Sequence, residues 1–163
     1  MYERVGKWLN RVDALLVVIC IALIVMMTIV MTMLVFTRNF LDFSFPWSEE
    51  ITRFMMIWLA FLGAAILVHR DDHIALDFLP VTLRGGARFC LMLFLRILTL
   101  FAMGLLFWQA IQILEVRGRT VAPALGISLI WIYAAIPVSA ALMIVFQAYR
   151  IWTDWRIFRY KEA

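Results

Sequence analysis

Two adjacent carboxylates and an arginine, Glu49, Glu50 and Arg53, stand just before a long uncharged run. On a helix, spacings of three and four residues bring Arg53 within reach of both acids. Carboxylates at membrane depth are costly and often handle protons or cations, so one interpretation is an ion-carrying site. The other is a self-neutralised cluster at the membrane surface, or one that docks a partner. We favour the second because the acids stand at the end of the run and not at its middle.

A second polar cluster follows the run. His69 and His73 would share one helix face, with Asp71 and Asp72 close by, and this spacing suits a metal ion. The chain has 2 histidines in all, so no third histidine could complete such a site. Haem would need axial histidines on opposing helices, and these two are one turn apart. We therefore predict no metal and no cofactor.

Other polar or aromatic residues in or beside the apolar runs suggest contacts and not chemistry. We expect Arg70 to form ion pairs with the acids that follow it, Asp77 among them, and so to fix a loop. Arg96 stands inside the third apolar run, where it either reaches along the surface to the membrane interface or pairs with a carboxylate of a partner subunit. Trp58 and Trp131 lie away from the predicted interfaces and are expected to contact another protein.

The composition indicates the elements that position these residues. Of the 163 residues, 66% are hydrophobic, whereas a soluble domain is about half apolar. A helix from Glu49 to His69 would be about 31 Å long, close to the thickness of a bilayer's hydrocarbon core. We predict an all-α integral membrane protein, one four-helix domain over residues 1–163. Its membrane-crossing helices are expected at about residues 14–36, 48–69, 89–114 and 128–149.

The connections also have signatures. Residues 1–13 read as a short amphipathic lead that suits a membrane surface, and Ser48 is placed to cap the second helix. Residues 74–84 are apolar but too short to span, which predicts a short interfacial helix between the second and third crossings. Ser128 is placed to cap the fourth helix, after an irregular stretch. Pro137 should kink that helix because it cannot donate a backbone hydrogen bond.

One face of the second helix carries small residues, Ala60, Gly63 and Ala64, which would let another helix pack closely. Basic residues are concentrated before the first crossing, after the second and at the C-terminus, so both termini are predicted to be cytoplasmic. The net charge of +4 needs no nucleic-acid partner, because flanking arginines account for it.

An ordered set of residues resembles the small membrane subunit (DctQ-like, or Q subunit) of tripartite ATP-independent periplasmic (TRAP) transporters. The set comprises Arg38-Asn39, Trp47-Ser48-Glu49-Glu50-x-x-Arg53, Trp58, Phe61-Leu62-Gly63-Ala64, Arg70, His73-Ile74, Asp77, Pro123, Gly126, Ile136-Pro137 and Leu142-Met143. The resemblance implies a scaffold or stator in the bacterial inner membrane, and not an enzyme.

In that family a large elevator-type membrane subunit holds the substrate and ion sites, and a periplasmic binding protein captures an organic acid. The resemblance therefore implies those two partners, beside membrane lipid, and sodium-driven uptake of a C4-dicarboxylate or a sialic acid. It also implies that Glu49, Glu50 and Arg53 contact a partner or order the periplasmic mouth. Two alternatives stay open: an autonomous homo-oligomeric transporter that uses Glu49 or Glu50, and a membrane anchor of a redox enzyme.

Overall fold

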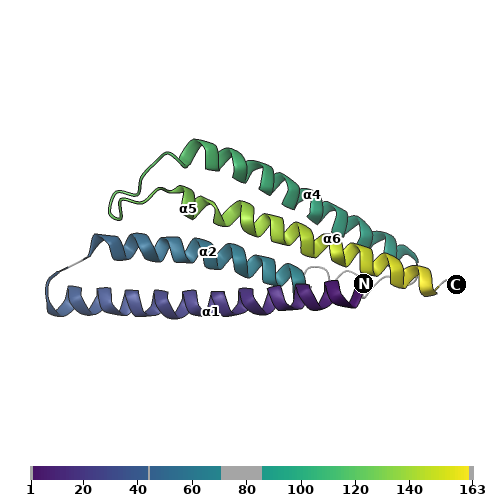
Figure 1. The fold of residues 1–163 in the computed structure, drawn as a ribbon, viewed down its shortest axis with the longest axis horizontal. Coiled ribbons are helices and arrows are strands. Elements are labelled where there is room, and N and C mark those ends of the chain that lie inside the picture. The colour runs from purple at the N-terminus through teal and green to yellow at the C-terminus, as the bar shows by residue number, and fades with distance from the viewer. Residues whose placement is uncertain (1, 44, 71–85, 162–163) are drawn as a thin grey trace.

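The computed structural model describes residues 2–43, 45–70 and 86–161. Apart from one isolated bridge, the regular secondary structure in these ranges is helical (Figure 1). The helices are α1 (Tyr2–Phe40), α2 (Pro46–Arg70), α4 (Gly86–Arg117), α5 (Ile130–Tyr133) and α6 (Ala135–Lys161). The described residues include 4 segments long and apolar enough to cross a membrane, Gly6–Phe40, Pro46–Arg70, Leu93–Arg117 and Ile130–Thr153. The predicted all-α membrane class is thus confirmed, whereas the expected interfacial helix falls outside the described residues.

The helices lie side by side in the order α1, α2, α6 and α4, and each packs mainly on its neighbours in that order (Figure 1). We call the end where α1 begins and α6 finishes the terminal end, and the opposite end the loop end. Since α4 carries the chain back to the loop end, α2 and α6 run parallel to each other. The central pair, α2 and α6, therefore links the two outer helices.

The main buried cluster joins α1, α2 and α6, with one residue from α4. Phe146 of α6 is its largest fully buried side chain, at 1% exposure. Association of helices in lipid depends on close packing. The small Ala65 therefore matters to this cluster as much as the large side chains do, because it lets the helices approach closely. The cluster consists of Leu9, Leu16, Cys20, Leu62, Ala65, Val68, Met103, Met143 and Phe146.

Packing within the chain uses a different face of α2 from the predicted small-residue face. Leu62, Ala65 and Val68 are buried, whereas Ala60 is exposed. A methyl group added at Gly63 would meet nothing within 4 Å among the described residues. Among the described residues the small-residue face is therefore open at Ala60 and beside Gly63, whereas Ala64 is half-buried against the main buried cluster.

Two helix starts differ from the sequence prediction. The lead over residues 1–13 is not a separate element, because α1 runs without a break from Tyr2. The second helix begins at Pro46, so Ser48 lies inside its first turn and is not its N-cap. The Ser48 hydroxyl instead donates to the Phe45 carbonyl at 2.6 Å. Proline suits a first helical position, since its fixed φ is helical and its missing N–H would have no acceptor there.

Between α4 and α5 the chain forms a short hairpin, residues 118–129, in agreement with the predicted irregular stretch. An isolated bridge pairs Val121 with Ser128, and Gly126 has a φ of 67°, which glycine adopts without strain. The Ser128 hydroxyl donates to the Gly118 carbonyl at 2.6 Å and accepts from the Ile130 N–H at 3.3 Å. Ser128 thus joins the hairpin to the start of α5, but the predicted cap is wrong, because the N-cap residue is Leu129, which makes no side-chain cap hydrogen bond.

The predicted irregularity near Pro137 is present as a break between α5 and α6. The interruption falls at Ala134, three residues before the proline. Pro137 has no N–H to offer the carbonyl of Tyr133, which lies four residues before it. The fourth crossing is therefore a short helix followed by a long one.

Candidate functional site: polar clamps at both ends of α2

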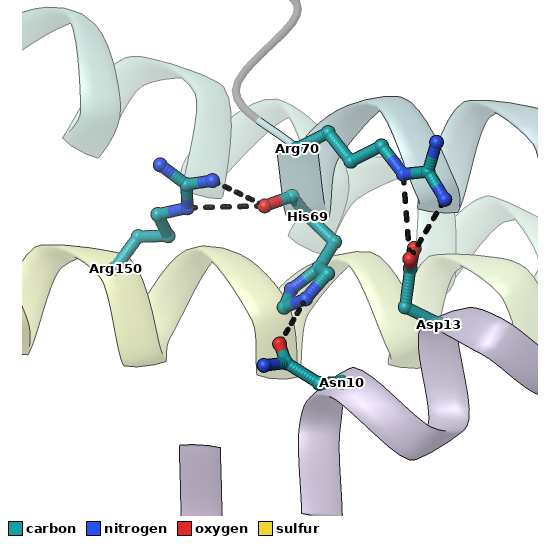
Figure 2. A network of polar contacts seen from close by, with 5 residues as sticks. All are labelled: Asn10, Asp13, His69, Arg70 and Arg150. Atoms are coloured by element: carbon teal, nitrogen blue, oxygen red, sulfur yellow. Dashed lines mark hydrogen bonds and ion pairs between the residues drawn. The ribbon is translucent and has the colours of Figure 1, made fainter. Parts of the chain in front are cut away.

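At the terminal end, α2 is fixed to α1 by an ion pair (Figure 2). Arg70 donates to Asp13 Oδ2 from Nη2 at 3.0 Å and from Nε at 3.3 Å. The Asp13 side chain is 12% exposed, whereas that of Arg70 is 49% exposed. Of the pair, the carboxylate therefore depends more on its partner, because it is the less hydrated group.

Asp13 was not predicted as the partner of Arg70. The expected acids, Asp71, Asp72 and Asp77, lie outside the described residues. In the part of the chain that the structure describes, the ion pair of Arg70 runs to the preceding helix. Asp13 is the last charged residue before the first apolar run, and this position was the available signal.

His69 connects α2 to both α1 and α6 (Figure 2). Its Nε2 lies 3.2 Å from Asn10 Oδ1, and its ring lies 4.6 Å from the Phe146 ring, between centroids. Its backbone carbonyl accepts hydrogen bonds from Arg150, through Nε at 3.1 Å and also through Nη2. A guanidinium suits this position because the last carbonyls of a helix lack intrahelical donors and carry partial negative charge.

These contacts give His69 a structural role. The other histidine of the predicted pair, His73, lies outside the described residues. Among the described residues, no group of three histidine, cysteine or acidic side chains is placed to hold a metal ion. We call the contacts of Asn10, Asp13, His69, Arg70 and Arg150 the terminal clamp.

At the loop end, α2 is fixed to the hairpin by a single carboxylate. Glu50 Oε2 accepts from the backbone N–H groups of Ala124 at 3.0 Å and Leu125 at 2.8 Å. Charge-assisted hydrogen bonds of this kind are stronger than neutral ones. About two turns further along α2, Trp58 Nε1 donates to the Trp131 carbonyl at 3.1 Å and ties α2 to α5. We call these contacts of Glu50 and Trp58 the loop clamp.

The expected cluster of Glu49, Glu50 and Arg53 does not form as a unit. Glu50 turns to the hairpin, and no ion pair within the described residues joins Arg53 to either acid. Glu49 and Arg53 instead line a groove between α1 and α2, which they share with Arg38. Helical spacing placed Glu50 within reach of Arg53, but Glu50 instead accepts hydrogen bonds from two backbone N–H groups of the hairpin.

Arg96 and the tryptophans also have definite positions. Arg96 is only 7% exposed, and its carbonyl accepts a hydrogen bond from Gln147 Nε2 at 3.4 Å, so it lies against α6 and not along the outer surface of α4. Trp58 makes its hydrogen bond within the chain, whereas the side chain of Trp131 is 70% exposed. Of the two, only Trp131 presents its ring outward as the sequence prediction requires.

The arrangement holds helices together at both ends of α2 and leaves its middle apolar. A model of the DctQ component of tripartite ATP-independent periplasmic transporters matches residues 26–157, which is most of the chain. The chain belongs to the DctQ family. DctQ proteins are transport components and not enzymes. The family match and the four long apolar helices together make this chain a multi-pass membrane protein of a bacterial inner membrane.

Individual DctQ relatives agree with the family match. The chain is 28% identical over 149 residues to the sialic acid TRAP transporter small permease protein SiaQ of Vibrio cholerae, covering 91% of this chain and 84% of SiaQ. It is 26% identical over 139 residues to a putative TRAP transporter small permease protein of Haemophilus influenzae, covering 85% and 82% respectively. It is also 29% identical over 97 residues to the permease protein SiaT of H. influenzae, covering 60% of this chain and 16% of SiaT.

Proposed function

We propose that this chain is the scaffold, or stator, of a TRAP transporter that takes up an organic acid with a sodium gradient. Its partners would be a large elevator-type membrane subunit and a periplasmic binding protein. The names of SiaQ and SiaT favour a sialic acid, with a C4-dicarboxylate as the other class. The length of SiaT supports the proposal of a large membrane partner. The segment that matches this chain makes up only 16% of that permease, so most of SiaT is additional to it.

One observation carries the proposal: α2 is fixed at both ends within the chain, while one of its faces is open. The terminal clamp and the loop clamp fix the helix to α1, α6 and the hairpin. The open face, which we define as Ala60, Gly63 and Leu67, has Ala60 and Leu67 exposed and, among the described residues, free space beside Gly63. A mobile subunit needs a rigid surface to move against, and small residues allow a close helix contact.

The test is to fill the open face. Gly63→Leu should leave this chain folded, since a methyl group added at Gly63 meets nothing within 4 Å among the described residues, and should block close approach of a large-subunit helix. The matched control is Gly104→Leu on α4, where an added methyl also meets nothing within 4 Å among the described residues. Both changes replace a poor helix former by a good one.

Gly63→Leu is expected to lower co-purification of the large subunit and organic-acid uptake several-fold, whereas Gly104→Leu leaves both near wild type. Uptake would be measured in cells that express the whole transporter, with the amount of this chain in the membrane as the check on folding. Equal assembly and equal uptake for the two variants would reject the open face as the partner surface. Flux through liposomes that contain this chain alone would reject the stator role itself.

A further inference from the structure

A groove of about 570 Å³ opens between α1 and α2 at the loop end. Its apolar floor includes Met31, Leu34 and Met56, and Met31 and Met56 are 43% and 62% exposed. Three charged residues stand along its mouth, Arg38, Arg53 and Glu49. The groove lies on the same side of α2 as the open face, which begins one turn after Met56, at Ala60.

The charges of the groove do not neutralise one another. Among the described residues, no ion pair joins Glu49 to Arg38 or Arg53, and neither arginine has a hydrogen bond to the rest of the chain. Two cations against one carboxylate leave the mouth with one positive charge in excess. Guanidinium groups bind phosphate well because their planar donors match two phosphate oxygens at once.

The position of the groove in the membrane decides which phosphate it meets. Arg38 stands near the end of the first span, Gly6–Phe40, and Arg53 lies in the first turns of the second, Pro46–Arg70. Charged residues at span ends lie at the level of the lipid headgroups. Met31 is two helical turns before Arg38, so the floor descends about 10 Å toward the acyl chains.

From this geometry we propose that the α1–α2 groove binds one anionic glycerophospholipid. Its phosphodiester lies between Arg38 and Arg53, and an acyl chain covers the methionine and leucine floor. A single net negative charge on the headgroup, as in phosphatidylglycerol, offsets the excess charge of the mouth. Glu49 repels an anionic headgroup, so it lowers the affinity of the groove for the lipid. This proposal does not depend on the stator role.

The test is native mass spectrometry of the full chain, purified in mild detergent and supplied with phosphatidylglycerol or phosphatidylcholine. The wild-type chain should retain one phosphatidylglycerol in preference to phosphatidylcholine. The double variant Arg38→Gln/Arg53→Gln should retain roughly twenty-five-fold less phosphatidylglycerol, since each arginine near a headgroup contributes about a factor of five and the two factors multiply. Glu49→Gln should retain more than wild type because a repelling charge is lost.

Two controls separate a built site from general surface charge. Arg117→Gln/Arg119→Gln removes two exposed cations at the same end of the molecule but outside the groove, and should leave retention unchanged. Met56→Trp fills the exposed floor and should lower retention of both lipids. Equal retention by the groove variant and the wild type overturns the proposal, as does an equal loss in the Arg117/Arg119 control. A wild-type chain that does not distinguish the two lipids also overturns it.

Discussion

Glu49 and Glu50 are neighbours in the chain with unlike surroundings. Glu50 accepts two backbone hydrogen bonds from the hairpin, whereas Glu49 faces the α1–α2 groove. Consecutive helix positions point about 100° apart, so adjacent identical residues commonly face different surfaces. The two carboxylates therefore give a matched pair for mutation.

Glu50→Ala should release the tip of the hairpin. The variant leaves the N–H groups of Ala124 and Leu125 without an acceptor, and loss of hydrogen bonds to a charged group costs about 1.5–3 kcal/mol. Amide hydrogen exchange at residues 124 and 125 should become at least about tenfold faster. Glu49→Ala, which removes a carboxylate with no hydrogen bond to the described chain, should leave exchange at both amides unchanged. Similar exchange in the two variants would contradict the loop clamp.

The ion pair of Asp13 and Arg70 should show an asymmetric loss of stability. Arg70→Ala leaves a carboxylate that is 12% exposed without its partner, whereas Asp13→Ala leaves a guanidinium that is 49% exposed to solvent. We therefore expect Arg70→Ala to lower the unfolding temperature more. A double-mutant cycle in detergent should give a coupling free energy of about 1 kcal/mol. Additive single effects would mean that the pair does not stabilise the fold.

At the scale of elements, α2 packs against α1 and α6, and the short helix α5 also contacts it. The break at Ala134 separates α5 from α6, and α5 supplies the carbonyl that accepts the Trp58 hydrogen bond. A missing backbone donor at Pro137 explains why the helix of the last crossing is interrupted at Ala134. The short helix before the interruption is the one that the Trp58 side chain contacts.

Pro137→Ala should join α5 to α6. The alanine supplies an N–H that can donate to the Tyr133 carbonyl, and one such bond contributes about 0.5–1.5 kcal/mol. Slower amide exchange over residues 134–138 would report the change. Pro46→Ala is the matched control, because Pro46 is the first residue of α2 and an N–H there has no intrahelical acceptor. Unchanged exchange at 134–138 in Pro137→Ala would mean that packing, and not the proline, sets the break.

At the scale of the whole molecule, the terminal end carries both chain termini and the loop end carries the hairpin (Figure 1). Basic residues are concentrated toward the terminal end along the sequence, which favours a cytoplasmic position for that end. We therefore propose that the loop end, with the Glu50 clamp and the α1–α2 groove, faces the periplasm. This orientation places the proposed lipid site in the outer leaflet of the inner membrane.

Cysteine labelling tests the orientation. In a chain with Cys20 and Cys90 changed to alanine, Leu41→Cys should react with a membrane-impermeant maleimide in intact cells, since Leu41 is 66% exposed in the loop between α1 and α2. Lys7→Cys, also exposed, should react only after the inner membrane is opened. The reverse pattern would invert the proposed topology.

Much of this structure could be predicted from the order of residues alone. Hydropathy located the four crossings, and Pro137 indicated the interruption in the last of them, because both follow from backbone and side-chain chemistry within a short segment. The ordered set around α2 was enough to suggest the family, which the match to the DctQ component then confirmed. In each case the cause and the effect lie within a few turns of one helix.

The tertiary structure decided which residues meet across helices. Spacing along α2 favoured Arg53 for Glu50, and nearby acids for Arg70, but the hairpin amides and Asp13 of α1 are the partners found among the described residues. Likewise, the small size of Ala60 and Gly63 did not say whether α1, α6 or another subunit would pack there. A helix fixes neighbours three and four positions apart, whereas lateral contacts depend on how the helices are ordered and rotated. The stretch around α2 specified its charges and its small residues. The placement of its neighbours decided that Glu50 and Arg70 hold this chain together and that Ala60 is exposed while Ala64 is half-buried.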